Sequence, residues 1–396
     1  MPKSRKRRRP HATRRSPHDP ASSRRAQLED LETVRPWLET MFAVDDAERR
    51  GDADEALRLI SGRLLGPDGR AFWRPWRVSR LAQVTLLGPA LPAWAVSRWI
   101  VAQAHETFGG AGDRRRRRSL ELALEVRGST DGLSVHGEDD AMCKMIDHDW
   151  VYRQLFLYEL GGLSAFIRSA ATPDLLAGAD RIREWAKAPM VALRLEERTA
   201  ESVTWERVDD REPLVLPNIG SAALVVPGEH VLGRLVPVEA GAMLESAPLV
   251  VPAEIADRVA EDPTSWIDAI AAARDRVPTG GFESGLLHDV RDTIWQLALT
   301  NPADAPPDES EIGVYLARAT VELARQCLAE PFVWAPDDID PWACVRAALL
   351  SLSVVTRLPQ VAGPGDAILF ERLAHRLAQP ADIVCRDVAR QLRMAA

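Results

Sequence analysis

The sequence changes its periodicity at Met190, where the stretch MVALRLEERTAESVTWERVDDREPLVLPNIG begins and runs to residue 220. Short runs rich in Val, Leu and Trp alternate there with turn-forming residues such as Asp209-Asp210 and Asn218, a pattern that predicts short strands. The same pattern continues to Pro252. We therefore expect five or six antiparallel strands in residues 190–252, arranged as a small barrel or curled sheet. The expected strands are 191–195, 203–208, 214–216, 222–226, 231–238 and 249–251.

Helical periodicity lies on both sides of this stretch. Before it, apolar residues recur at steps of three and four from Leu28 to Leu38, which is typical of a helix with one buried face. The pattern holds over most of residues 26–188 and includes a strong helix over 149–171 with an interruption at Gly161-Gly162. After Pro252, helices are expected over 253–261, 263–276, 283–299, 309–329, 341–357, 366–378 and 381–393. The fold class is therefore mainly α-helical with a small antiparallel β module (α+β) in the middle of the chain.

These changes divide the chain into four expected parts. Residues 1–25 hold ten Lys or Arg and one acidic residue, and they contain no Leu, Ile, Val, Phe, Tyr or Trp. Such a segment cannot bury enough apolar surface to offset the entropy of ordering, so a disordered basic tail is expected. An N-terminal helical region over 26–189, the β module over 190–252 and a C-terminal helical region over 253–396 follow.

Composition excludes several classes of protein. The chain has 396 residues, 46% of them hydrophobic, and a net charge of −8. This is too apolar for a wholly disordered chain, no apolar run is long enough to span a membrane, and four cysteines do not make a disulfide scaffold. We expect a cytoplasmic protein with no membrane contact. Only four of the 50 basic residues are lysine, which favours a bacterial source with a GC-rich genome.

The charge is unevenly distributed, because the first 127 residues carry +10 and the remainder carries −18. Clustered arginines can bind a polyanion through phosphate contacts and counterion release. The alternatives are a solvated tail shaped by coding bias and, near Trp73 and Trp76, aromatic side chains in the core with arginines facing solvent. The candidate polyanion-binding residues are Arg5, Arg7, Arg8, Arg9, Arg14, Arg15, Arg74, Arg77, Arg114, Arg115 and Arg116.

Residues 136–149 are the best candidates for metal chemistry, because His, Asp and Glu gather there. His136, Asp147, His148 and Asp149 could bind a metal ion and support hydrolysis. The alternative is that Asp147 or Asp149 caps the helix that begins at Trp150. No cofactor is expected, since the sequence contains neither a P-loop nor a complete dinucleotide-binding glycine motif.

Three hypotheses for function remain. The leading one is a non-enzymatic interaction protein, an adaptor that binds a protein partner and contacts a polyanion through its basic tail. The second is a protein that binds nucleic acid without sequence specificity, using the tail and the arginines named above. The third is a metal-dependent hydrolase built on residues 136–149. The lack of a recognised catalytic motif favours a protein that is not an enzyme.

Overall fold

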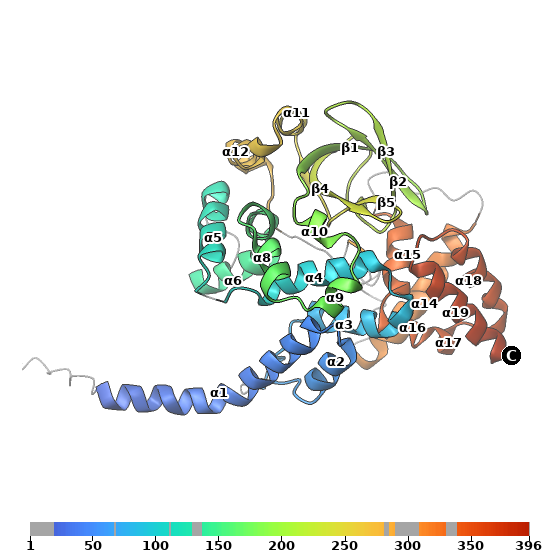
Figure 1. Ribbon diagram of the computed structural model, residues 1–396. Helices are drawn as coiled ribbons and strands as arrows, with labels where there is room; N and C mark the ends of the chain where they lie inside the picture. Colours follow the sequence, from blue (N-terminus) through green and yellow to red (C-terminus); the bar gives the residue numbers. More distant parts are fainter. Residues whose placement is uncertain are drawn as a thin grey trace, which may run out of the picture.

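The computed structural model describes residues 20–66, 69–110, 112–128, 137–280, 285–289, 309–329 and 339–395. It is 59% helical, with a small antiparallel half-barrel in the middle of the chain. In Figure 1 the β module lies above the N-terminal helices, and the C-terminal helices stand beside both. The expected α+β fold is confirmed.

The N-terminal helices begin earlier than the sequence pattern suggested. The first helix, α1, starts at Pro20 and so includes the end of the segment expected to be a disordered tail; its outer part projects away from the body (Figure 1). The helices are α1 (Pro20–Arg49), α2 (Ala53–Ser61), α3 (Pro75–Leu87), η1 (Gly88–Ala90), α4 (Ala93–Thr107), α5 (Arg114–Arg127), α6 (Glu138–His148), α7 (Trp150–Gln154), α8 (Gly162–Ser169), α9 (Pro173–Ala177) and α10 (Ile182–Trp185).

A π-helical turn, η2 (Leu155–Glu159), joins α7 to α8. The expected break at Gly161-Gly162 is present, and both glycines are required by the backbone. Gly161 has a φ of +70°, and a Cβ at Gly162 would lie 2.6 Å from the carbonyl oxygen of Phe156. Turns of this π type are uncommon and are often found at functional sites.

The β module is one sheet with the strand order β3-β2-β1-β4-β5, and β6 pairs with the first part of β4. Its strands are β1 (Met190–Arg198), β2 (Ser202–Arg207), β3 (Pro213–Pro217), β4 (His230–Val238), β5 (Gly241–Leu244) and β6 (Leu249–Val251). All pairs are antiparallel, and a bulge lies between Leu195 and Glu197 in β1. Leu193, Leu195 and Trp205 belong to a separate small core inside the curled sheet.

One expected strand is wrong. Residues 222–226 form turns, in which Ala223 N–H donates to the Gly220 carbonyl and Val225 N–H donates to the Ala222 carbonyl. Ala223 is buried against Ala343 of the C-terminal region, so its burial comes from a loop contact and not from a sheet. The fifth strand is instead β5, which begins at Gly241, the last residue of the turn expected at Glu239-Ala240-Gly241.

The C-terminal region is helical throughout its described residues. Its elements are α11 (Ala253–Glu261), η3 (Pro263–Ser265), α12 (Trp266–Ala272), η4 (Arg274–Arg276), α14 (Glu309–Cys327), α15 (Pro341–Leu349), α16 (Leu352–Val355), α17 (Leu358–Val361), η6 (Pro364–Asp366), α18 (Ala367–Ala374) and α19 (Ala381–Met394). The helix expected over 283–299 lies outside the described residues, except for 285–289, which are not helical.

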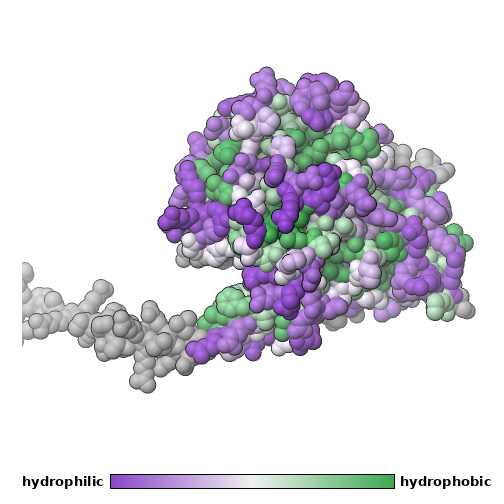
Figure 2. All heavy atoms as spheres, viewed as in Figure 1, coloured by the Kyte–Doolittle hydropathy of each residue, from purple (hydrophilic) through white to green (hydrophobic). Residues whose placement is uncertain are grey.

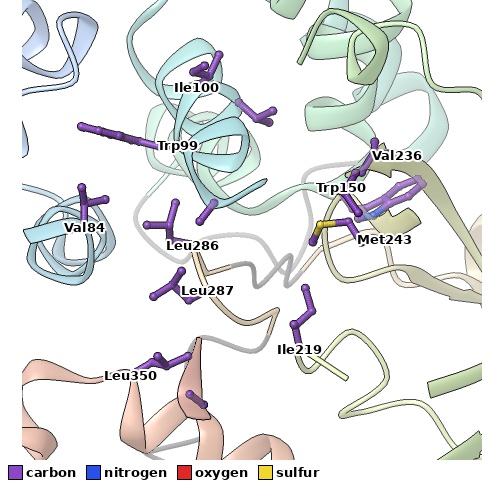
Figure 3. Close-up of a cluster of buried hydrophobic side chains, with 14 of the residues drawn as sticks. Val84, Trp99, Ile100, Trp150, Ile219, Val236, Met243, Leu286, Leu287 and Leu350 are labelled. Carbon is purple, nitrogen blue, oxygen red and sulfur yellow. The ribbon is translucent and has the colours of Figure 1, made fainter. Parts of the chain in front are cut away.

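A single large cluster of buried side chains extends from Val44 to Leu392 and so connects the two helical regions. Its centre is drawn in Figure 3, where Leu286 and Leu287 lie among α3, α4 and the end of α15. In this view Val84 belongs to α3, Ile100 belongs to α4, and Leu350 directly follows the last residue of α15. The short segment 285–289 therefore reaches the middle of the molecule.

Within the described residues, no single helix is long and apolar enough to cross a membrane. One pair of helices, Pro341–Leu349 with Leu352–Val361, satisfies the length and composition test only when taken together, and it is bent by 76°.

Candidate functional site

A polar cavity of about 100 Å³ lies where the parts of the chain meet. It is bordered by α3 and α4, the end of α6, α7, the residue that follows β5, the segment 285–289 and the end of α15. Sites at the junction of several structural units commonly bind ligands. The lining residues are Trp76, Ser79, Arg80, Gln83, Arg98, Ala102, His105, Glu106, Asp147, Arg153, Glu245, Gly285, Leu286, His288, Ala347 and Ser351.

Helical spacing explains how two helices provide half of this lining. On α4, Arg98, Ala102 and His105 are separated by steps of four and three residues, which places them on one face. On α3, Trp76, Arg80 and Gln83 follow the same rule. Both helices therefore present polar side chains to the cavity in the protein interior, where most helices present apolar side chains.

Four buried or partly buried ion pairs surround the cavity. Arg80 donates two hydrogen bonds, of 3.0 and 2.6 Å, to the carboxylate of Glu106. Arg153 pairs with Glu245. Two further pairs join the cavity wall to its surroundings: Arg98 Nη1 lies 2.6 Å from Asp289 Oδ1, and Arg74 Nη2 lies 2.7 Å from Asp147 Oδ1. Each carboxylate in the lining therefore has an arginine partner.

Arginine partners lower the pKa of Glu106 and Glu245, whereas burial raises the pKa of Asp147 and Asp289 despite their partners Arg74 and Arg98. Burial alone would raise the pKa of Glu106, but the charge and hydrogen bonds of Arg80 lower it to about 2. Burial likewise opposes ionisation of Glu245, and Arg153 together with a hydrogen bond from Ser246 brings its pKa below the usual value. The cavity therefore contains fixed opposite charges at neutral pH.

His105 is the neutral member of the site. It is only 6% exposed, and its ring meets Tyr152 edge to face at 5.9 Å. Burial and the nearby positive charges of Arg153 and Arg116 hold the pKa of His105 well below its ordinary value. The imidazole is therefore uncharged at pH 7 and can offer one donor and one acceptor.

The buried nitrogen atoms of lining side chains that have no hydrogen-bond partner among the described residues include Arg80 Nε, Arg98 Nε and His105 Nε2. A buried polar atom without a partner costs about 1–3 kcal/mol, and such atoms are rare in native proteins. The three side chains that carry these atoms all line the same polar cavity.

A second layer of hydrogen bonds holds the cavity floor. Gln154 Oε1 accepts from Arg234 Nε at 2.8 Å, and Arg234 also pairs with Glu159 on the π-helical turn η2. The Glu245 carboxylate additionally accepts from Ser246 at 2.8 Å. The β module is thereby fixed to α7 and η2, which sets the position of Glu245 and Arg153 in the cavity.

The residues predicted to bind a polyanion are dispersed by the fold. Arg5, Arg7, Arg8, Arg9, Arg14 and Arg15 lie outside the described residues. Arg77 is buried and pairs with Asp45 and Glu48, so the expectation that the arginines near Trp73 face solvent is wrong for Arg77 and Arg80. Burial also removes Arg77 from any surface that a polyanion could reach.

The other predicted arginines are engaged to different degrees. Arg74 pairs with Asp147, as described above. Arg114 is exposed at the start of α5, and Arg115 pairs with Asp113, the residue that caps this helix. Arg116 donates to the carbonyl of Phe108 and lies over the ring of Phe156. Arg116 thus fixes α5 to the core, whereas the side chain of Arg114 is exposed to solvent.

The predicted metal-binding residues do not converge. His136 lies outside the described residues, and no group of three His, Cys, Asp or Glu in the described part of the chain could hold a metal ion. His148 packs edge to face on Trp76 at 5.5 Å. Asp149 caps α7, accepting from Tyr152 N–H at 2.8 Å and from Arg127 at 3.1 Å. The alternative interpretation, in which Asp149 caps a helix, is the one found here.

Sequence reasoning missed the centre of the site. Arg98, His105, Arg153 and Glu245 were not selected because each occupies a single position in an apolar stretch and forms no motif. A signal was nonetheless present: an arginine and a histidine seven residues apart on one face of an otherwise apolar helix indicate a polar contact across that face.

The comparisons with known proteins give no further indication, because no family model, no curated protein and no solved structure matches this chain.

Proposed function

We propose that this protein binds a small polar ligand in the cavity between α3, α4 and α7. The observation that carries the proposal is the set of three buried nitrogens, on Arg80, Arg98 and His105, that lack a partner among the described residues. A chain that buries so many charged groups without completing their hydrogen bonds loses stability unless a bound molecule supplies the missing partners.

The size of the cavity limits the ligand. Sites for drug-sized molecules occupy roughly 300–1,000 Å³, whereas this cavity measures about 100 Å³. The space suits a compound with a few carbon atoms and several polar groups. Water would fill such a polar site in the absence of the ligand, so the ligand must replace the hydrogen bonds that water makes.

Closing the cavity tests this proposal. Ala102 lies on the cavity face of α4, and Ala93 is exposed near the start of the same helix. We expect a thermal-shift screen of small polar metabolites to find compounds that stabilise the wild-type protein and the Ala93→Leu control. The same compounds should not stabilise Ala102→Leu, because its larger side chain occupies the ligand space. Equal stabilisation of all three proteins would contradict the proposal.

The interaction-protein hypothesis is a second candidate, and the surface of α1 favours one form of it. Leu38 and Phe42 lie one helical turn apart, and Phe42 is 59% exposed. Leu64 and Leu65 are exposed nearby, and Trp37 donates to the Leu65 carbonyl. Hydrophobic atoms gather where α1 leaves the body (Figure 2).

We propose that this face of α1 pairs with α1 of a second copy in antiparallel orientation. Such pairing would bury the exposed side chains of Leu38 and Phe42 from both copies in one contact. Sedimentation of the wild-type chain should then show a dimer, which Phe42→Glu disrupts and Glu39→Gln on the same helix does not. A wild-type chain that stays monomeric at high concentration would exclude this pairing.

A further inference from the structure

We infer that the ligand of the cavity carries no net charge and belongs to the small polyols, an inference that rests on the proposed binding function. It follows from the balance of fixed charges around the cavity, from the mixture of donors and acceptors that the lining offers, and from the cavity's small size.

The charges of the lining cancel. Arg80, Arg98 and Arg153 provide three positive charges, and Glu106, Asp147 and Glu245 provide three negative charges. Their partners outside the lining, Arg74 and Asp289, also have opposite signs. His105 is neutral, because its pKa is held well below the ordinary value. Among the lining residues and these two partners, the positive and negative charges are equal in number.

A charged ligand would find no unpaired counter-ion among the described residues that line this cavity. Removing an ionised group from water costs several kcal/mol, and a protein recovers that cost only when an opposite charge is available. Here each arginine already faces a carboxylate, so an incoming anion would have to displace Glu106 or Glu245 from its partner. A neutral molecule avoids this competition.

The open groups favour hydroxyls on the ligand. Arg80 Nε and Arg98 Nε can only donate, whereas His105 Nε2 can donate or accept according to its tautomer. Ser79 and Ser351 bring further hydroxyl groups to the lining. A hydroxyl group both donates and accepts, so a compound with several of them can satisfy this mixture in a small space. Trp76 offers an apolar surface for the carbon skeleton of such a compound.

Three compounds of similar size test which ligand charge the cavity prefers. Glycerol is neutral, glycerate is an anion and serinol is a cation. Dissociation constants would be measured by NMR titration of the full chain at pH 8. We expect glycerol to bind at least tenfold more tightly than either charged analogue, and Ala102→Leu to abolish its binding. Binding of glycerate or serinol that equals or exceeds that of glycerol would overturn the inference while leaving the cavity as a binding site. Binding of none of the three would count against the neutral-polyol inference, whereas the metabolite screen with Ala102→Leu tests the binding function separately.

A charge variant provides an independent test. Glu106→Gln keeps the shape of the side chain but leaves the cavity with one excess positive charge. It should therefore shift the preference by at least tenfold from glycerol toward glycerate. Glu121→Gln, on the exposed side of α5, removes the same charge away from the cavity and should leave the preference unchanged. An unaltered preference in Glu106→Gln would contradict the charge-balance argument.

Discussion

His105 is held in a neutral state by the groups that surround it. Burial disfavours the imidazolium, and Arg153, Arg116 and Arg74 add repulsion that Glu106 only partly offsets. Because the unfolded chain binds a proton at this histidine near pH 6.5 and the folded chain does not, acidification favours the unfolded state. The free energy of unfolding begins to fall as the pH drops below 6.5. It continues to fall until the pH reaches the lower pKa of His105 in the folded protein.

The consequence can be measured by urea unfolding at pH 7.5 and pH 5.5. The wild-type protein should lose about 1 kcal/mol more stability between these values than His105→Gln, which has no group to protonate there. The Arg80–Glu106 pair contributes little to the difference, since the pKa of Glu106 is about 2. An equal loss in both proteins would show that His105 accepts a proton in the folded state.

At the scale of the element, α7 illustrates how a short helix positions the site. It has only five residues, Trp150–Gln154, and its N-terminus depends on the Asp149 carboxylate. This carboxylate is buried and also accepts from Arg127 at 3.1 Å and from Thr279 at 3.2 Å. Since α7 carries Arg153 into the cavity, the cap fixes one of the three arginines of the lining.

Replacing this cap should therefore affect both stability and the site. We expect Asp149→Ala to lower the free energy of unfolding by about 3 kcal/mol, because the helix loses its cap and Arg127 loses its partner. Asp149→Asn retains a capping oxygen and should lose less. Asp52 caps α2 in the same way but is exposed, so Asp52→Ala is the matched control and should cost about 1 kcal/mol. Equal losses from the two alanine variants would contradict the role assigned to Asp149.

Elements could be predicted from the sequence far better than the site could. The change of periodicity at Met190, the break at Gly161-Gly162 and α11 at Ala253–Glu261 are all present, because local spacing and turn chemistry determine them. The segment 222–226 was misassigned because most of its apolar residues are buried in a turn, with Ala223 against the distant helix α15. The cavity was missed because Arg98, Arg153 and Glu245 are brought together only by tertiary packing. No local sequence pattern indicates that these residues are close in space.

At the scale of the whole molecule, polar contacts connect the β module to the C-terminal helices. Asn218 is fully buried and donates to the Thr199 carbonyl at 2.7 Å and to Asp340 Oδ2 at 2.9 Å. It also accepts from Arg346, whose pKa is lowered to about 10 by burial despite the charge of Asp340. One amide thus contacts two charged side chains of the C-terminal region and a backbone carbonyl of the β module.

Removal of this amide should destabilise the whole chain. We expect Asn218→Ala to lower the free energy of unfolding by about 3 kcal/mol, because Arg346 and Asp340 lose a partner while they remain buried. Gln326→Ala removes an exposed amide on α14 that contacts the Glu322 side chain at 3.4 Å, and should change stability by no more than about 0.5 kcal/mol. Chemical denaturation followed by tryptophan fluorescence compares the two, and a similar effect of both variants would mean that Asn218 does not link the regions.

We propose that the cavity formed by both helical regions and the β module holds a small neutral polar molecule. Isothermal titration calorimetry at pH 8 with erythritol, a neutral four-carbon polyol, measures this binding. We expect saturable binding at one site per chain in the wild-type protein and in Ala93→Leu, and no binding in Ala102→Leu. Heat signals that are absent from the wild-type protein, or that persist unchanged in Ala102→Leu, would contradict it.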